Sequence, residues 1–309
     1  MKIKKSKIVD IIGSPISLAS PEKGASMGPD AIRISGLRES LHHLDVDFRD
    51  LGNLPVLEEP FPPKEFPKGE IRYLDEVYDF MSQLKEKVFT SLTEGNFPLI
   101  LGGDHSSALG SLAAVVKYHK SKGQKPGLIW FDAHADYNTE ETSPSGNIHG
   151  MPLAVATGIG NDKLLSLFEG NFLDPHRCVL LGVRSVDPIE GKLLDDAGVT
   201  VLTMKDIDEK GIYQCVKEAI RISSRDSKNP IHLSFDIDGL DMMLTPGTGT
   251  PVLGGVTLRE AHLLMELLAE SEMLQSMDLV EVNPILDTKN QTALVAKSLI
   301  ESALGKVIY

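Results

Sequence analysis

Short apolar runs that alternate with segments of helical periodicity constrain the fold of this chain more than any other feature. Eight runs have the length and composition of strands: Lys7–Ile12, Val46–Asp50, Pro98–Leu101, Gly127–Phe131, Cys178–Val183, Thr200–Leu202, Ile231–Phe235 and Ser276–Val280. Segments with apolar residues at helical spacing lie between them: Tyr73–Leu92, Ala108–Tyr118, Asp206–Ile222, Leu258–Leu268 and Ala293–Ala303. This alternation predicts right-handed crossovers and a parallel sheet covered by helices on both faces. Periodicity alone leaves open whether the sheet closes into a barrel.

The length of the chain and the lack of a clear linker predict one domain spanning residues 1–309. The proline-rich stretch Pro55–Pro67 is typical of an irregular surface excursion, and no internal repeat is visible. The basic start is followed by an apolar run that Asp10 and Pro15 interrupt, which argues against a signal peptide and a membrane span.

The charge and the cysteines narrow the classes of partner and compartment. The net charge of −13 argues against a nucleic-acid-binding or membrane-binding surface and favours a cationic small molecule as ligand. The two cysteines, Cys178 and Cys215, lack the Cys-x-x-Cys spacing of a redox motif, so we expect a reducing, cytoplasmic location.

The stretch Leu128–Asp136 begins as a buried strand and ends with ionisable residues at every second position. In extended backbone, Asp132, His134 and Asp136 would share one face. Grouping two carboxylates and an imidazole where an apolar strand ends is costly unless a cation compensates. A divalent metal ion is the simplest such cation.

Two other strand ends supply further candidate ligands. Gly102-Gly103-Asp104-His105-Ser106 follows one strand, and Ser234-Phe-Asp-Ile-Asp-Gly-Leu-Asp241 follows another. The combined set of candidate ligands is His105, Asp132, His134, Asp136, Asp236 and Asp238. Six ligands exceed what one catalytic metal takes from protein, and they suit two ions about 3.5–4 Å apart. Oxygen-rich ligation favours Mn²⁺ or Mg²⁺, whereas the imidazoles also admit Zn²⁺, Co²⁺ or Fe²⁺, and we expect two Mn²⁺ per subunit.

Each signal taken alone has a simpler interpretation. A single histidine after a Gly-Gly turn is more often structural than a ligand, and an isolated Asp-x-Asp is more often a turn or a helix cap. Asp104 and Asp241 are interpreted in that way, as turn residues that support the ligands. Three such signals at three strand ends together favour a metal site.

These three motifs, in this order, resemble the signatures of the ureohydrolase family, which includes the arginases and agmatinases. The resemblance extends from Gly102 to the C-terminus, and Lys23–Asp30 is similar to an early Gly-Pro turn of the family. It implies a three-layer αβα fold with an open, mostly parallel, eight-stranded sheet rather than a barrel. It also implies a binuclear manganese site and assembly into homotrimers or homohexamers.

Most closely, the chain resembles the arginases in its loops. The segment Asn138–Gly150 is similar to the arginase loop that binds the α-carboxylate of the amino acid, which implies that role for Asn138, Ser145 and Asn147. The alternative is a polar loop with ordinary turn chemistry. Agmatine has no carboxylate, so an agmatinase would not need this loop.

Further similarities assign the rest of the substrate pocket. Asp187 and Glu190 match the acidic residues that face the α-amino group, although Asp187-Pro188 also has the pattern of a helix N-cap. Glu281 lies where the family binds the guanidinium, and Thr250 lines the pocket. The chain departs from the family at Ser185, where many arginases have an acid, and at Met242-Met243, where Asp-Pro is common.

The resemblance implies hydrolysis of L-arginine to L-ornithine and urea by a hydroxide that bridges the two metals. Asp136 would relay a proton to the leaving amine, His149 would act as proton shuttle, and Glu281 would orient the guanidinium. One alternative is an agmatinase or another hydrolase of guanidino or formimino acids. The others are a single-zinc deacetylase, which six ligands disfavour, and a metal-stabilised regulatory scaffold without turnover.

Overall fold

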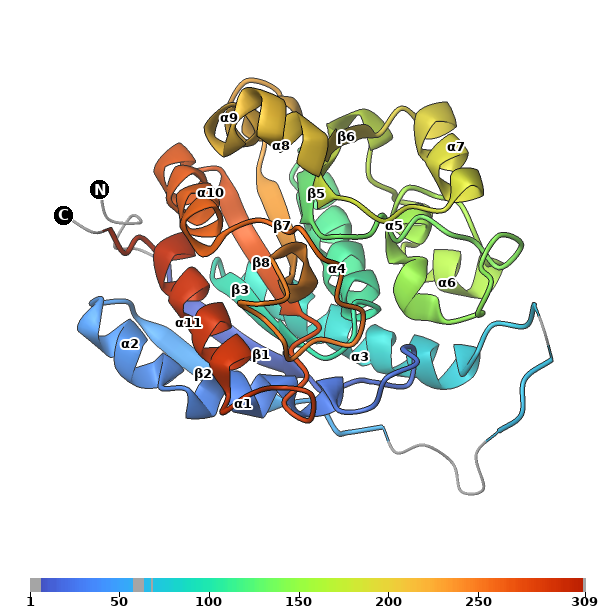
Figure 1. The fold of residues 1–309 in the computed structure, drawn as a ribbon, viewed down its shortest axis with the longest axis horizontal. Coiled ribbons are helices and arrows are strands. Elements are labelled where there is room, and N and C mark those ends of the chain that lie inside the picture. The colour runs from blue at the N-terminus through green and yellow to red at the C-terminus, as the bar shows by residue number, and fades with distance from the viewer. Residues whose placement is uncertain (1–6, 58–63, 68, 308–309) are drawn as a thin grey trace.

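Eight strands form one sheet in the computed structural model, which describes residues 7–57, 64–67 and 69–307 (Figure 1). The strands are β1 (Val9–Ser14), β2 (Phe48–Asn53), β3 (Phe97–Gly102), β4 (Gly127–Phe131), β5 (Cys178–Val183), β6 (Thr200–Thr203), β7 (Ile231–Asp236) and β8 (Leu274–Val280). All eight expected strands are confirmed, two of them with the same bounds. The other bounds differ by one to three residues at either end, because strand ends depend on pairing partners that a single run does not reveal.

The sheet is open and parallel. Its order is β2-β1-β3-β8-β7-β4-β5-β6, so β2 and β6 are edges and no barrel closes. All pairings between neighbouring strands are parallel. The expected three-layer αβα fold is therefore confirmed, and the sheet is parallel throughout rather than mostly parallel.

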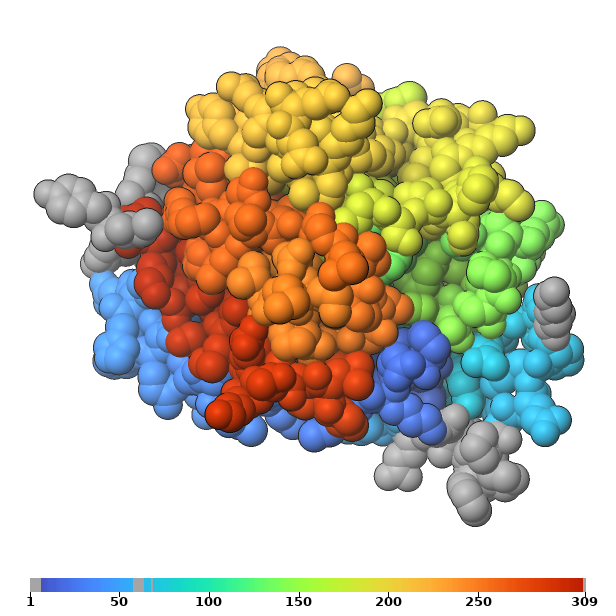
Figure 2. Space-filling model, in the orientation of Figure 1, coloured from blue at the N-terminus to red at the C-terminus, as the bar shows by residue number. Residues whose placement is uncertain are grey.

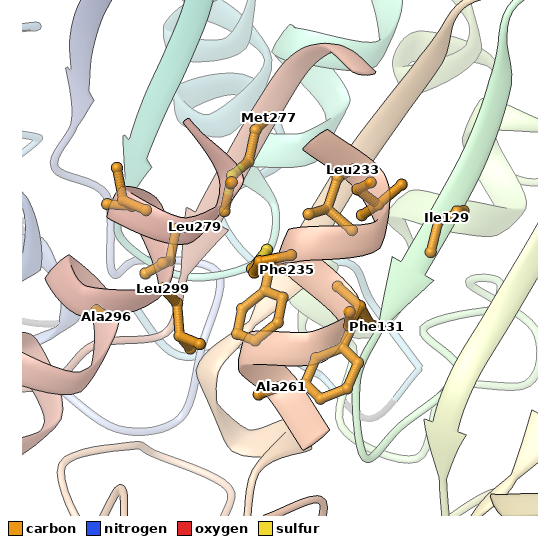
Figure 3. Packing of buried hydrophobic residues seen from close by; sticks show 14 of the residues in the cluster. Ile129, Phe131, Leu233, Phe235, Ala261, Met277, Leu279, Ala296 and Leu299 are labelled. Carbon is orange, nitrogen blue, oxygen red and sulfur yellow. The ribbon is translucent and has the colours of Figure 1, made fainter. Parts of the chain in front are cut away.

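Alternate residues of the central strands enter two cores. Ile129 and Phe131 of β4 pack with Phe235 of β7 in one core, and the rings of Phe131 and Phe235 stack with centroids 4.3 Å apart (Figure 3). Leu128 and Trp130 of the same strand enter the other core. Because both faces of β4 are buried, this strand is continuously apolar.

Helices cover both faces of the sheet (Figure 1). They are α1 (Gly28–Ile34), α2 (Leu37–His43), α3 (Leu74–Thr93), α4 (Ser107–Ser121), α5 (Pro152–Ala156), α6 (Asp162–Ser166), α7 (Pro188–Ala197), α8 (Met204–Lys210), α9 (Ile212–Ser224), α10 (Leu258–Ser271) and α11 (Gln291–Ala303). One expected helix, Asp206–Ile222, is in fact two, because Gly211 has a positive φ of 79° between α8 and α9. The short helices α1, α2, α5 and α6 were missed because they are too short to show periodicity.

The expected surface excursion is only partly described. Residues 58–63 of this stretch lie outside the described part of the chain, as do residue 68 and residues 1–6 of the basic start. The described residues 54–57 and 64–67 form neither helix nor strand. No helix within the described ranges is long and apolar enough to cross a membrane.

The strand order determines where ligands can gather. β3, β8, β7 and β4 are consecutive neighbours at the centre of the sheet although they are far apart in the sequence. Since all four run in the same direction, the segments that follow them emerge at one edge. In open α/β sheets this C-terminal edge is where ligands bind.

Candidate metal centre

The six side chains expected to bind metal meet at the C-terminal edge of these central strands. His105 lies between β3 and α4, and Asp236 and Asp238 lie at the end of β7 and in the turn that follows it. The other three, Asp132, His134 and Asp136, follow β4. The structure therefore brings all six together, as the sequence predicted.

The local reason for this convergence differs from the expected one. β4 ends at Phe131, and the segment that follows bends instead of continuing as an extended strand. The backbone N–H of His134 donates to Asp132 Oδ1 at 2.7 Å, and Asp136 has a positive φ of 49°. The prediction of a shared strand face was thus wrong: a tight turn, and not alternation, directs these side chains to the site.

The six residues form two groups that share Asp132. His105 Nδ1 lies 3.0 Å from Asp132 Oδ2 and 3.1 Å from an oxygen of both Asp136 and Asp236. His134 Nδ1 lies 3.4 Å from Asp132 Oδ1 and 3.2 Å from Asp238 Oδ2. Asp132 thus presents one oxygen to each group, which is the arrangement of a carboxylate that bridges two metal ions.

One buried nitrogen atom without a hydrogen-bond partner indicates whether these residues fit a metal ion. Three carboxylate oxygens lie within 3.1 Å of His105 Nδ1, yet this buried nitrogen has no partner in hydrogen-bond geometry among the described residues. A buried nitrogen of this kind is normally satisfied. A cation placed between the nitrogen and the oxygens would satisfy all of them, so the residues fit a binuclear metal site.

The charges of the metal-free site also favour the binding of cations. Burial, followed by repulsion from Asp238 and Asp132, raises the pKa of Asp236 well above its usual range. Burial and the charge of Asp132 raise the pKa of Asp238 to about 6. Burial opposes a charge on His134, but its contacts with Asp132 and Asp238 outweigh burial and raise its pKa to about 12. The metal-free site therefore retains protons that metal binding would displace.

We expect Mn²⁺ binding at pH 8 to release at least one proton per subunit, that of the His134 imidazole. The metal-free protein holds this proton at pH 8, because the contacts of His134 with Asp132 and Asp238 outweigh burial and raise its pKa to about 12. The contacts of His105 with Asp132, Asp136 and Asp236 outweigh burial in the same way and raise the pKa of His105. Since binding requires the unprotonated form, affinity falls as the pH falls. Calorimetric titrations in buffers of different ionisation enthalpy measure the released protons. A heat of binding independent of the buffer contradicts this expectation.

Neighbouring groups hold the ligands in place. The indole of Trp130 stacks on the His105 ring at 3.9 Å and donates to Asp132 Oδ2 at 3.0 Å. The guanidinium of Arg184 donates to the carbonyl oxygens of Asp238 and Leu240, and also to that of Val252 in a later loop. Arg184 therefore ties the turn that carries Asp238 to a distant segment. The sequence does not reveal this role, because no local pattern indicates a cation that binds backbone carbonyl groups.

Asp104 and Asp241 have the supporting roles expected for them. Asp104 is fully buried, accepts from the backbone N–H of Ala19 at 3.1 Å and bonds Ser106. Asp241 accepts from the backbone N–H of Met243 at 2.9 Å. Burial and the charge of Glu281 raise the pKa of Asp104 to about 6.

Glu281 directly follows β8 and is buried rather than exposed at a sheet edge. Its Oε1 accepts from the backbone N–H of the ligand residue His105 at 2.8 Å and lies 3.6 Å from His149 Nδ1. Glu281 also has a positive φ of 64°. Backbone strain of this kind persists where the surroundings fix a functional residue.

The expected substrate loop is closed by its own hydrogen bonds. The backbone N–H of Asn138 donates to Gly150 O at 3.1 Å, and the Asn138 side-chain oxygen accepts from Thr142. The group of Asn138 left for a ligand is its NH₂ donor. The hydroxyl of Ser145 accepts from the N–H of Asn147, whose buried Oδ1 has no partner among the described residues.

Three further expected substrate residues lie around this loop. Asp187 is exposed and caps α7 in a capping box, as its Asp-Pro pattern indicated. Glu190 is buried, and its two oxygens accept from the N–H groups of Tyr137 and Asp187, while burial raises its pKa to about 7. Glu190 therefore joins α7 to the segment after Asp136. Thr250 donates to Asp238 Oδ2 at 3.0 Å.

Comparison with known proteins agrees with the fold and identifies the family of the chain. A family model described as "Arginase family" matches residues 7–305. The chain is similar to the arginase of Bacillus subtilis, with 44% identity over 97% of this chain and 98% of that one. It is also similar to an arginase of Staphylococcus aureus strain MSSA476, with 43% identity over 98% and 99% of the two chains.

The chain is also similar to a solved arginase structure. The native structure of Bacillus caldovelox arginase superimposes with a TM-score of 0.93 at 42% identity, covering 98% of this chain and 100% of that chain. The chain belongs to the arginase family.

Proposed function

We propose that this protein is an arginase that hydrolyses L-arginine to L-ornithine and urea with two Mn²⁺ ions per subunit. One observation carries the proposal. Two histidine-carboxylate groups share Asp132, and the buried Glu281 carboxylate is fixed beside them by the backbone of the ligand residue His105. His105, Asp132, Asp136 and Asp236 would hold one ion, and Asp132, His134 and Asp238 the other.

Two divalent cations bound there would supply a water molecule acidified to a nucleophile near neutral pH. Glu281 has the chemistry to bind the substrate guanidinium through two parallel hydrogen bonds, because the planar fork of that group matches a carboxylate. Its rigid position would hold the guanidinium carbon beside the metal centre, and attack then becomes effectively intramolecular.

Two residues are assigned to proton transfer. Asp136 is buried beside His105 and would carry the proton of the nucleophilic water to the leaving amine. His149 is half-buried, with 17% of its side chain exposed, and would exchange protons between the pocket and solvent. Burial opposes a charge on His149, but Glu281 outweighs burial and raises its pKa.

The amino-acid end of the substrate is assigned to the loop and to α7. Asn138, Ser145 and Asn147 would bind the α-carboxylate through neutral donors, which leaves the negative charge of the metal site intact. Asp187 would bind the α-amino group, while Glu190 positions Asp187 through its N–H, and Thr250 would line the pocket beside Asp238. Because Ser185 stands where many arginases have an acid, Asp187 would be the main residue that binds the α-ammonium group of the substrate.

The remaining assignments concern domain organisation, cellular location and oligomeric state. We propose a single domain over residues 1–309, a cytoplasmic location consistent with two unpaired buried cysteines, and a homotrimer or homohexamer. Exposed apolar residues support assembly: Met243, Leu253, Ile285, Leu286 and Leu294. The orange and red segments of the chain adjoin one another on the face shown in Figure 2. Size-exclusion chromatography with light scattering measures the oligomer.

Urea formation by the Mn²⁺-loaded protein tests the proposed function. L-Arginine, agmatine and guanidinobutyrate should be assayed side by side, with bound metal counted in the same samples. Two metals per subunit and a clear preference for L-arginine support an arginase. A preference for agmatine indicates an agmatinase, and full metal occupancy without urea from any of the three indicates a scaffold.

Substitution His149→Ala is expected to lower turnover by about 10- to 30-fold and to leave both metals bound. The loss stays moderate because a buffer molecule can replace a half-exposed proton carrier. Turnover, metal content and rescue by added imidazole check this. His176→Ala, at an exposed histidine outside the site, serves as control. Loss of metal in His149→Ala would refute its assignment as a shuttle.

Substitution Gly146→Ala is expected to raise KM for L-arginine by about 10-fold or more and to leave the metal content unchanged. Gly146 has a positive φ of 70°, and an added Cβ would lie 2.1 Å from the carbonyl oxygen of Glu70. The loop with Ser145 and Asn147 must therefore shift. Gly150→Ala is the matched control, because a Cβ there meets open space. If the two variants have equal KM values, the loop does not take part in substrate binding.

A further inference from the structure

A buried polar cluster lies behind His105, on the side of its ring opposite the carboxylates. Its members come from one helix and two strands, and each is 0% exposed: Ser111 of α4, His232 and Ser234 of β7, and Ser276 and Asp278 of β8. None of them belongs to the six proposed ligands or to the substrate pocket. Polar groups buried this deeply are costly unless they form hydrogen bonds, so the cluster requires an explanation.

The register of the sheet aligns the cluster with His105. Ser234 pairs with Asp278, and His232 pairs with Ser276, across the neighbouring strands β7 and β8. Met277 and Leu279, which flank Asp278, enter the apolar core of the other face. The polar column therefore occupies only the face of these strands that α4 covers, and His105 lies at its end.

The contacts form a line that leads to the proposed metal ligand. His105 Nε2 lies 2.9 Å from Ser234 Oγ, and this hydroxyl lies 3.5 Å from Asp278 Oδ2. The same carboxylate oxygen is 3.1 Å from His232 Nε2. Ser111 also donates to it at 2.7 Å, but from outside this line.

The direction of the hydrogen bonds follows from the chemistry of a ligating imidazole. His105 directs Nδ1 towards the carboxylates, so this nitrogen has to carry the lone pair and Nε2 the proton. Nε2 then donates to Ser234, which passes its own hydroxyl proton towards Asp278. An acceptor at the end of the line thus selects the tautomer that can bind metal. Such partners orient metal-binding histidines and raise their basicity.

We propose that Asp278, paired with His232, is a positioning residue that acts through Ser234 to hold His105 in the orientation and tautomer needed for one of the two metal ions. Asp278 does not touch substrate or metal. Its effect is confined to the ion that His105 binds, and the second ion, beside His134, is independent of it. The inference rests on the metal site of the proposed function, but not on the identity of the substrate.

Titration of the metal-free full-length protein with Mn²⁺ alone tests this proposal. For Asp278→Asn and for Ser234→Ala we expect the affinity for one ion to fall by about 10- to 100-fold, with the affinity for the other unchanged. Ser111→Ala is the matched control, because it removes a hydrogen bond to the same oxygen without breaking the line. Its two affinities should equal those of the natural protein.

Three results would overturn the proposal. They are unchanged Mn²⁺ affinities in Asp278→Asn and Ser234→Ala, an equal loss of affinity for both ions in these variants, and the same loss of affinity for one ion in Ser111→Ala. Thermal melting of each metal-free variant checks folding. If Asp278→Asn does not fold, Ser234→Ala decides the question, because it keeps the Asp278–His232 pair intact. A natural protein that binds two Mn²⁺ but forms no urea refutes the proposed function alone, whereas one that binds no Mn²⁺ refutes both.

Discussion

Substitution Asp132→Ala is expected to weaken the binding of both metal ions by at least ~100-fold and to abolish measurable urea formation. Among the residues that the structure describes, Asp132 alone presents one oxygen to the His105 group and the other to the His134 group. Its removal therefore disrupts both metal positions at once. Metal content after dialysis at graded free Mn²⁺, together with urea formation, measures the effect.

The same substitution should remove the stabilisation that metal confers. A ligand present at 100 times its dissociation constant stabilises the folded state by about 2.7 kcal/mol, and the variant loses this increment. Melting with and without Mn²⁺ should show a metal-dependent rise for the natural protein and none for Asp132→Ala. Asp208→Asn, at an exposed aspartate of α8 outside the site, should behave like the natural protein. Full metal occupancy in Asp132→Ala would exclude it as a ligand.

Substitution Glu281→Gln is expected to lower kcat/KM for L-arginine by about 10³-fold while both metals stay bound. Glutamine can still accept from the backbone N–H of His105, so the local structure is preserved. It lacks the charge and the second acceptor oxygen that a guanidinium requires. Steady-state kinetics and a metal count on the same preparation measure this loss.

A control separates this effect from the general cost of altering a buried acid. Glu301 of α11 is also buried and pairs with Lys297 and Lys306, but it does not belong to the site. Glu301→Gln should leave kcat/KM unchanged. If Glu281→Gln retains near-normal kcat/KM, then Glu281 does not bind the guanidinium, and the substrate assignment has to be revised.

Secondary structure in this protein followed closely from local pattern. The inner strands β1, β3, β4, β5, β7 and β8 were predictable because they are buried on both faces and therefore appear as short, largely apolar runs. The edge strands β2 and β6 are more exposed. Helix boundaries were less accurate. Gly211 divides one periodic segment into α8 and α9, because its backbone conformation, and not its hydrophobicity, ends the first helix.

The candidate ligands were predictable for a different reason. His105 and Asp132 lie just beyond a strand and Asp236 is the last residue of one, and parallel strands end at a common edge. The alternation argument for Asp132, His134 and Asp136 was wrong, although all three do reach the site. A turn with positive φ at Asp136 directs them there, and no spacing rule in the sequence predicts that dihedral angle.

By itself, the sequence determined the elements, the chemical type of the ligands and their position at strand ends, because these depend on neighbours along the chain. The tertiary structure alone decided two things: that β3, β8, β7 and β4 lie side by side, and that Asp278 lies behind His105. Each of these depends on which strands pair and in what register. Pairing is settled by packing between residues that are far apart in the sequence, and local periodicity does not record it.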